Sequence, residues 1–272
     1  MKFSINIIGA SALGQTLAKL FVVNNLGIIG GIYNRTPIKA KKAIEFIGSG
    51  EYCSSIADLP HANITFITTA DEYIIPAAQL FSENKNIQPN DIVVHCSGVL
   101  SSKYLELLRE KNCLLASVHP MRSFVIPEKS VAEYPGTYCA LEGDLFAIPF
   151  LEKLFVGIGS IVYLVNKDKK ALYHSAGVFA SNYLLTMAKQ SIEVLVESGI
   201  DREMAVNITT SLMSGTLNNL INLKSAEAAL TGPIKRGDQA TIDMHLHALS
   251  GSSRKDLYFT LAKATKELLN IL

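Results

Sequence analysis

The segment Gly9-Ala10-Ser11-Ala12-Leu13-Gly14 has the spacing of a loop that binds the pyrophosphate of a dinucleotide. In such loops the glycines permit a tight turn, and the N–H groups that begin the next helix face the phosphates. Ser11 stands at the second glycine position, where a small residue still lets the phosphate approach the backbone. We therefore predict a dinucleotide contact at Gly9, Ser11, Ala12, Leu13 and Gly14; the alternative is a tight strand-to-helix turn without a ligand.

About 20 residues further on, where NAD-binding proteins carry an acid for the ribose hydroxyls, this chain has Asn34-Arg35-Thr36. A carboxylate would repel a 2′-phosphate, whereas Arg35 can pair with it and Asn34 and Thr36 can donate hydrogen bonds. The motif favours NADP(H) as the cofactor. Asn34 and Thr36 could also simply cap a helix that starts near Pro37.

Polar residues also end the later apolar runs, and ligands of open parallel sheets bind at the carboxyl ends of the strands. Thr69, Ser97 and His119 follow such runs, so we expect Thr69 to contact the cofactor and Ser97 and His119 to act on a substrate. Thr69 could equally be a helix-start residue. His95, at a strand end itself, is interpreted as a buried structural histidine.

The second half of the chain adds His174 and Asn182, polar groups on a largely apolar helix. They would contact either a substrate or a buried hydrogen-bonding partner. Histidine titrates near neutral pH, so His119 or His174 is the expected general acid, with His119 preferred because loops at strand ends hold catalytic groups near a cofactor.

Other polar features are interpreted as structural. Asp238 can cap a helix, and His245 and His247 diverge on a helix, so no metal site is expected. The charged cluster at residues 166–170 is interpreted as a solvated helix start.

The periodicity of apolar residues predicts the elements that position these groups. Strands are expected at 3–9, 28–33, 64–69, 92–95, 113–118, 137–141 and 160–165, and helices at 12–25, 37–47, 73–83, 101–111, 145–156, 167–197, 202–223, 239–249 and 254–272. Alternating strands and helices predict an α/β fold, a Rossmann-type doubly wound parallel sheet, followed by an all-α carboxyl-terminal domain. We place the domains at residues 1–165 and 166–272.

Composition narrows the classes of partner. The formal net charge of +1 and the absence of basic runs exclude an electrostatic nucleic-acid or membrane-surface binder. Four scattered cysteines without paired spacing, no signal-peptide pattern and no apolar run long enough to cross a bilayer predict a reduced, cytoplasmic protein that acts on a small molecule.

Several motifs together resemble a known family. In chain order they are Gly9–Gly14, Asn34-Arg35-Thr36, His95-Cys96-Ser97-Gly98, His119-Pro120-Met121, Tyr173-His174, Asn182-Tyr183, Leu230-Thr231-Gly232-Pro233 and Arg236-Gly237-Asp238. The chain resembles a bacterial family of NADP-binding oxidoreductases with a Rossmann-like domain and a helical domain of unknown function. That family belongs to the broad group of pyrroline-5-carboxylate reductase, ketopantoate reductase and the β-hydroxyacid dehydrogenases. The resemblance implies a homodimer formed through the helical domain.

The resemblance does not extend to a reaction. Asn182 falls where β-hydroxyacid dehydrogenases have the Asn of a K-x-x-x-N motif, but Val178 occupies the lysine position and cannot exchange a proton. The favoured hypothesis is an NADP(H)-dependent oxidoreductase for an imine or a 2-oxo or hydroxy acid, with reduced deazaflavin a less favoured partner. The alternatives are a non-catalytic NADP(H) sensor and a sugar-nucleotide or CoA binder.

Overall fold

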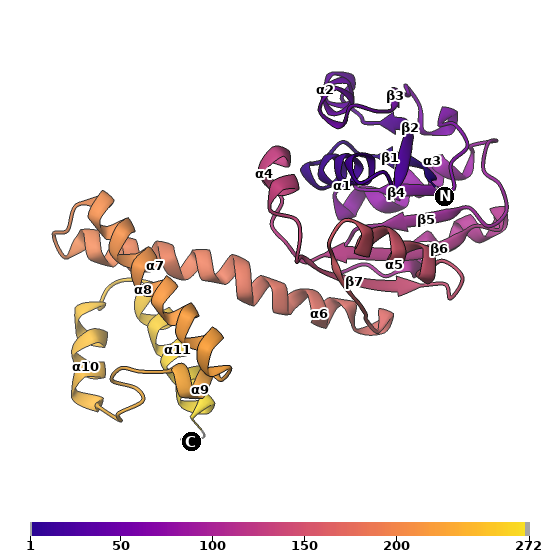
Figure 1. The fold of residues 1–272 in the computed structure, drawn as a ribbon. Coiled ribbons are helices and arrows are strands. Elements are labelled where there is room, and N and C mark those ends of the chain that lie inside the picture. The colour runs from indigo at the N-terminus through magenta and orange to yellow at the C-terminus, as the bar shows by residue number, and fades with distance from the viewer. Residues whose placement is uncertain (1, 270–272) are drawn as a thin grey trace. The chain divides into compact units, whose positions relative to one another are not determined.

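The computed structural model describes residues 2–269, which divide into two compact units, one ending at Gly177 and the other beginning at Val178 (Figure 1). The sequence placed a domain boundary after Val165. The first unit instead continues through a short helix, α6 (Lys170–Gly177), whose side chains complete the packing of the sheet edge.

The first unit is built on one eight-stranded sheet, in the order β3-β2-β1-β4-β5-β6-β7-β8. Its strands are β1 (Phe3–Ile8), β2 (Gly27–Tyr33), β3 (Glu51–Tyr52), β4 (Ile64–Ile67), β5 (Ile92–His95), β6 (Leu114–Pro120), β7 (Tyr138–Gly143) and β8 (Ile161–Leu164). The first six are parallel, as the apolar runs predicted for five of them; the two-residue β3 was not predicted. β7 pairs antiparallel with β6 and parallel with β8, so the last two strands run in the opposite direction.

Helices cover both faces of this sheet, as in a doubly wound fold (Figure 1). α1 (Ala12–Val23), α2 (Pro37–Ile47) and α5 (Ile148–Gly157) pack on one face, with Phe21, Phe66 and Phe155 in contact at its centre. α3 (Ile74–Ser82) and the 3₁₀ helix Ser102–Lys111 cover the other. The unit also contains α4 (Pro127–Ala132) and the short 3₁₀ turns Ile56–Asp58, Asp71–Tyr73 and Lys167–Lys169.

The second unit is helical, as predicted. It contains a π-helical segment (Val178–Asn182), α7 (Tyr183–Glu197), α8 (Arg202–Leu223), α9 (Ala226–Ala229), α10 (Gln239–Ala248) and α11 (Arg254–Leu268). The end of the helix predicted at 254–272 lies outside the described residues. None of the helices described here combines the length and apolarity that a membrane span needs.

Candidate functional site

The loop between β1 and α1 is shaped by its two glycines. Gly9 has φ +103°, and a Cβ there would lie 2.9 Å from the Thr69 nitrogen; a Cβ at Gly14 would lie 2.3 Å from Thr68 Oγ1. Thr68 Oγ1 donates to the Gly9 carbonyl at 2.6 Å, which ties the end of β4 to this loop. The fingerprint glycines therefore allow β1, α1 and β4 to meet with almost no space between their backbones.

Ser11, which stands at the second glycine position of the fingerprint, is the N-cap residue of α1. Its Oγ accepts a hydrogen bond from the Gly14 N–H at 3.1 Å. The Ala12 and Leu13 N–H groups precede the first intrahelical hydrogen bond and have no acceptor among the described residues. Thr69 Oγ1 is buried without a partner at the same loop. Free donors at a helix start and an unsatisfied hydroxyl beside them fit a bound pyrophosphate.

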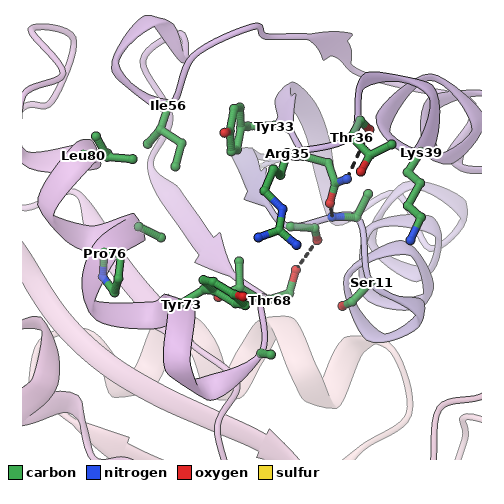
Figure 2. Close-up of a pocket in the computed structure, with 16 residues that line it drawn as sticks. Ser11, Tyr33, Arg35, Thr36, Lys39, Ile56, Thr68, Tyr73, Pro76 and Leu80 are labelled. Atoms are coloured by element: carbon green, nitrogen blue, oxygen red, sulfur yellow. Dashed lines mark hydrogen bonds between the residues drawn. The ribbon is translucent and has the colours of Figure 1, made fainter.

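A cavity of about 490 Å³ opens from this loop across the end of β2 (Figure 2). Its lining includes six of the predicted cofactor residues, namely Gly9, Ser11, Asn34, Arg35, Thr36 and Thr69. The other three, Ala12, Leu13 and Gly14, form the first turn of α1. Lys39 also lines the cavity; the sequence analysis missed it, although it lies one helical turn after the Asn34-Arg35-Thr36 motif.

The cations of this cavity are exposed. The Arg35 guanidinium lies over the Tyr73 ring, 5.1 Å from its centroid, and Figure 2 shows Thr36 and Lys39 on the neighbouring wall. Asn34 has a different position: its Oδ1 accepts from the Ala10 N–H at 3.1 Å, and its Nδ2 donates to the Thr36 carbonyl at 3.1 Å. Arg35 and Lys39 can reach a ligand phosphate, whereas the Asn34 amide supports the loop.

A second cluster occupies the ends of β5 and β6. His119 on β6 and His174 on α6 have ring centroids 5.8 Å apart, and both rings lie against Gly98. A Cβ at Gly98 would lie 2.4 Å from His174 Cδ2 and 2.8 Å from His119 Nε2, so only glycine fits. The sequence predicted these two histidines, and the structure brings them together.

The charge state of His119 differs from the expectation. Burial, followed by the positive charge of Lys170, lowers the pKa of His119 to about 4. The ring is therefore neutral at pH 7 and does not act as an imidazolium acid. The premise that His119 titrates near neutrality is wrong, because the fold buries it beside a cation.

Lys170 is a residue that the sequence analysis missed. Its side chain is 2% exposed, and Nζ donates to the Ser97 carbonyl at 2.8 Å and to Ser117 Oγ, with Glu142 Oε1 3.7 Å away. Burial lowers the pKa of Lys170 to about 8, although Glu142 opposes this shift. The interpretation of residues 166–170 as a solvated helix start is wrong for Lys170. This residue begins α6, and its side chain is buried against Ser97 and Ser117 of the first unit.

Glu142 on β7 is the counterion of Lys170 and is itself fully hydrogen-bonded. Its carboxylate accepts from the Ser102 N–H and from Ser102 Oγ, each at 2.7 Å. A buried lysine is thus present in this unit, although Val178 occupies the lysine position of the K-x-x-x-N motif. The spacing of Lys170 four residues before His174 was the available signal, since residues four apart share a helix face.

Ser97 and His95 are engaged in the local structure. Ser97 Oγ accepts from the N–H groups of Val99 and Leu100, at 3.2 and 3.0 Å. His95 is fully buried; Nε2 lies 3.1 Å from the Ser101 carbonyl and Nδ1 accepts from the Ser97 N–H at 3.2 Å. Burial lowers the pKa of His95 to about 3, which agrees with its interpretation as a structural histidine.

Asn182 ends the π-helical segment of the second unit, and its role remains a prediction. Asp238 caps α10, accepting from the Thr241 N–H at 3.1 Å, as one interpretation had it. His245 pairs with Tyr258 at 2.8 Å. Within residues 2–269, no group of His, Cys, Asp and Glu has a metal-binding arrangement.

Comparisons with known proteins agree with this architecture. Residues 137–265 match the model of a domain of unknown function, DUF2520. No curated protein matches the chain. The structure is similar to that of BF3122 of Bacteroides fragilis, named as a presumptive NADP oxidoreductase, with 22% identity, 98% of each chain covered and a TM-score of 0.80.

Two further structures extend the similarity. Protein TM1727 of Thermotoga maritima is 28% identical over 97% of each chain, with a TM-score of 0.75. An imine reductase of Myxococcus stipitatus in complex with NADP⁺ is 15% identical, with 97% of this chain and 92% of that chain covered and a TM-score of 0.67. The chain therefore shares the Rossmann-type fold of these structures, as the sequence predicted, and its carboxyl-terminal half matches DUF2520.

Proposed function

We propose that this chain is an NADP(H)-dependent oxidoreductase that transfers hydride to or from a small metabolite with a C=O or C=N group. One observation carries the proposal: the phosphate loop and the His119–His174 cluster lie at the carboxyl edge of the same parallel strands. β5 is two strands and β6 three strands from β1, roughly 10 to 15 Å at the usual strand spacing. A dinucleotide held at α1 extends along this edge.

The adenosine end of the cavity supports NADP(H) over NAD(H). Arg35 and Lys39 supply two cations, and no acid lines the cavity among the residues described. An arginine can form two parallel hydrogen bonds with a phosphate and can also stack on a flat ring, as it does on Tyr73.

The cofactor would supply the hydride, and the chain would supply orientation and control of protons. His119 presents a neutral ring beside Gly98, and the Lys170 ammonium beneath it has a pKa of about 8. A positive charge close to the reaction site stabilises negative charge that develops on a substrate atom.

A non-catalytic NADP(H) sensor is the second candidate. It is favoured by the burial of Lys170 and by the low pKa of His119, which leave neither group as a freely accessible acid at neutral pH. Such a protein would bind NADPH tightly and release it unchanged.

A two-step experiment distinguishes the oxidoreductase from the sensor. Binding of NADPH, NADH and CoA is first measured by calorimetry, and NADPH oxidation is then followed against 2-oxo acids and cyclic imines. NADPH binding with turnover that His119→Gln abolishes supports the enzyme, and binding without turnover across the substrates tested supports the sensor. Failure to bind NADPH contradicts both.

A further inference from the structure

The register of the last three strands aligns His119 with a tyrosine. His119 on β6 pairs with Ala140 on β7, and Ala140 pairs with Tyr163 on β8. Directly opposite residues of neighbouring strands point to the same face of a sheet. His119 and Tyr163 therefore share a face, about 10 Å apart across two strand spacings, with the small side chain of Ala140 between them.

Tyr173 of α6 joins the two side chains. Its hydroxyl lies 3.0 Å from His119 Nδ1, and the Tyr163 hydroxyl donates to it at 3.1 Å. The Tyr173 ring meets the His119 ring edge-on, with centroids 5.7 Å apart, and the Tyr163 ring at 6.3 Å. Three side chains from β6, β8 and α6 thus form one hydrogen-bonded chain.

We propose that Tyr163 and Tyr173 hold His119 in the neutral form that carries its proton on Nε2, so that His119 donates a hydrogen bond to a carbonyl oxygen of the substrate. The inference deepens the proposed function and rests on it for the hydride. Tyr163 donates to Tyr173, so Tyr173 turns its own hydrogen toward Nδ1, and Nδ1 is the unprotonated nitrogen of the ring.

The opposite nitrogen, Nε2, lies against Gly98, whose lack of a side chain leaves this edge of the ring uncovered by a Cβ. The missing Cβ of Gly98 would lie 2.8 Å from Nε2 and 2.9 Å from Cε1. His119 is partly exposed, and the proposal places the substrate oxygen at Nε2. Its neutrality follows from its surroundings: Lys170 and His174 are the titratable groups that lower its pKa electrostatically, and the tyrosines bring no negative charge because burial raises the pKa of Tyr173.

This arrangement selects the substrate class. A carbonyl oxygen has lone pairs that accept a hydrogen bond, whereas the nitrogen of a protonated imine has none and is repelled by an N–H donor and by the Lys170 charge. The geometry therefore favours a ketone, such as a 2-oxo acid, over an iminium ion.

The proton transfers balance without forming an imidazolate. When hydride reaches the carbonyl carbon, the oxygen takes the Nε2 proton while Tyr173 passes its proton to Nδ1. Tyr163 then reprotonates Tyr173, and Tyr163 takes up one proton from the solvent, so that the reduction consumes one hydride and one solvent proton. The ring ends as the Nδ1–H tautomer and returns to the Nε2–H form when the product alcohol has left and solvent has exchanged the ring proton.

The tautomer can be observed directly in the protein without cofactor. Long-range ¹H–¹⁵N spectra of ¹⁵N-histidine-labelled protein distinguish a protonated from an unprotonated ring nitrogen, and His119→Gln identifies the His119 signals among six histidines. At pH 7.5 we expect Nδ1 of His119 at the chemical shift of an unprotonated nitrogen and Nε2 at that of a protonated one. In Tyr173→Phe we expect averaged shifts from a mixture of tautomers.

Two variants complete the test. Tyr163→Phe keeps the Tyr173 hydroxyl but removes its donor, so the shifts of His119 move toward the mixture. Tyr138→Phe alters an exposed ring that stacks on Tyr163 at 6.4 Å without joining the chain, and it leaves the shifts unchanged.

A protonated Nδ1 in the unaltered protein, or identical His119 shifts in Tyr173→Phe, overturns the proposal, as does turnover of cyclic iminium ions in preference to 2-oxo acids. The two spectroscopic results do not depend on NADPH binding, which calorimetry measures separately.

Discussion

Arg35 and Lys39 line the cavity at the end of β2, and Arg35 is the predicted selector of NADP(H). We expect Arg35→Ala to weaken NADPH binding roughly tenfold to a hundredfold, as for other charge-assisted hydrogen bonds, and to change NADH binding little. Calorimetry with both cofactors measures the difference. Lys41→Ala, which removes a cation of the same helix region outside the cavity, is the matched control. Equal affinities of the unaltered protein for NADPH and NADH would contradict the assignment.

Lys170 and Glu142 form a buried ion pair, so removing one partner leaves the other uncompensated. We expect Lys170→Met to lower the free energy of unfolding by about 3–5 kcal/mol. Urea denaturation followed by circular dichroism measures the change. Lys103→Met removes an exposed partner of Asp168, and exposed pairs contribute little, so it should leave the midpoint unchanged.

The double replacement of Lys170 and Glu142 by methionine should recover part of the stability, because it removes both buried charges. Equal losses of unfolding free energy in Lys170→Met and Lys103→Met would contradict the prediction that the buried pair contributes more than the exposed one.

At the scale of elements, the first turn of α1 combines a helix cap with a phosphate site. Ser11→Leu removes the hydroxyl that accepts from Gly14, which costs about 1 kcal/mol of stability, and places a large side chain at the phosphate approach. We expect this variant to fold and to lose NADPH binding, measured by fluorescence titration. Ser11→Gly should bind NADPH normally and lose only a few tenths of a kcal/mol. Retained binding in Ser11→Leu would place the dinucleotide elsewhere.

The reversal of β7 is an element-scale feature with a consequence for the site. Because β7 and β8 run opposite to β6, the chain enters α6 next to the β6 edge and brings Lys170 under Ser97 and Ser117. A parallel β7 would change the register of β7 and β8, and Tyr163 would then no longer align with His119 through Ala140.

At the scale of the whole molecule, two buried neutral histidines couple folding to pH. The folded pKa values of His95 and His119, about 3 and about 4, lie below the ordinary 6.5, so the unfolded chain binds more protons between these values. Stability is therefore present above about pH 6.5 and falls as pH drops toward 4, by up to about 1.4 kcal/mol per pH unit for each histidine.

Thermal denaturation between pH 7 and pH 4 measures this dependence, and His119→Gln should reduce its slope by about half. Asp144, whose pKa Arg109 lowers below its ordinary 3.8, contributes only at more acidic pH. A slope in His119→Gln equal to that of the unaltered protein would contradict the prediction.

The second unit carries more apolar surface than its own helices cover. Among its described residues, the buried hydrophobic side chains are Ala205, Ile242 and Ala262, while Leu212 and Ile221 of α8 are each 68% exposed. Soluble monomers rarely expose large contiguous apolar patches. We expect a homodimer formed through this unit, and light scattering at micromolar concentration checks it. Leu212→Lys combined with Ile221→Lys should shift the mass to that of a monomer, and a monomeric mass of the unaltered protein would refute the expectation.

The sequence alone determined the features that depend on local pattern. Continuous apolar runs identified the buried strands β1, β4, β5 and β6, and the spacing Gly9–Gly14 predicted the tight turn from β1 into α1, whose phosphate contact stays a prediction. The absence of an acid after β2 predicts a preference for a 2′-phosphate, which stays a prediction, and the position of His119 and Ser97 at strand ends placed them at one edge of the sheet. The predictions of the strands, of the tight turn and of the strand ends succeed because these features are properties of short segments.

The tertiary structure decided which side chains meet. Lys170 belonged to a charged, apparently solvated segment until the helix α6 placed it against Ser97, Ser117 and Glu142. The burial of His119 itself, followed by the nearby Lys170 charge, lowers the pKa of His119 to about 4, which no local pattern indicates. Tyr163 and Tyr173 joined His119 only through the register of β6, β7 and β8. The physical reason is that pKa values and hydrogen-bond partners depend on strand order and register, which bring together residues that are distant in the chain.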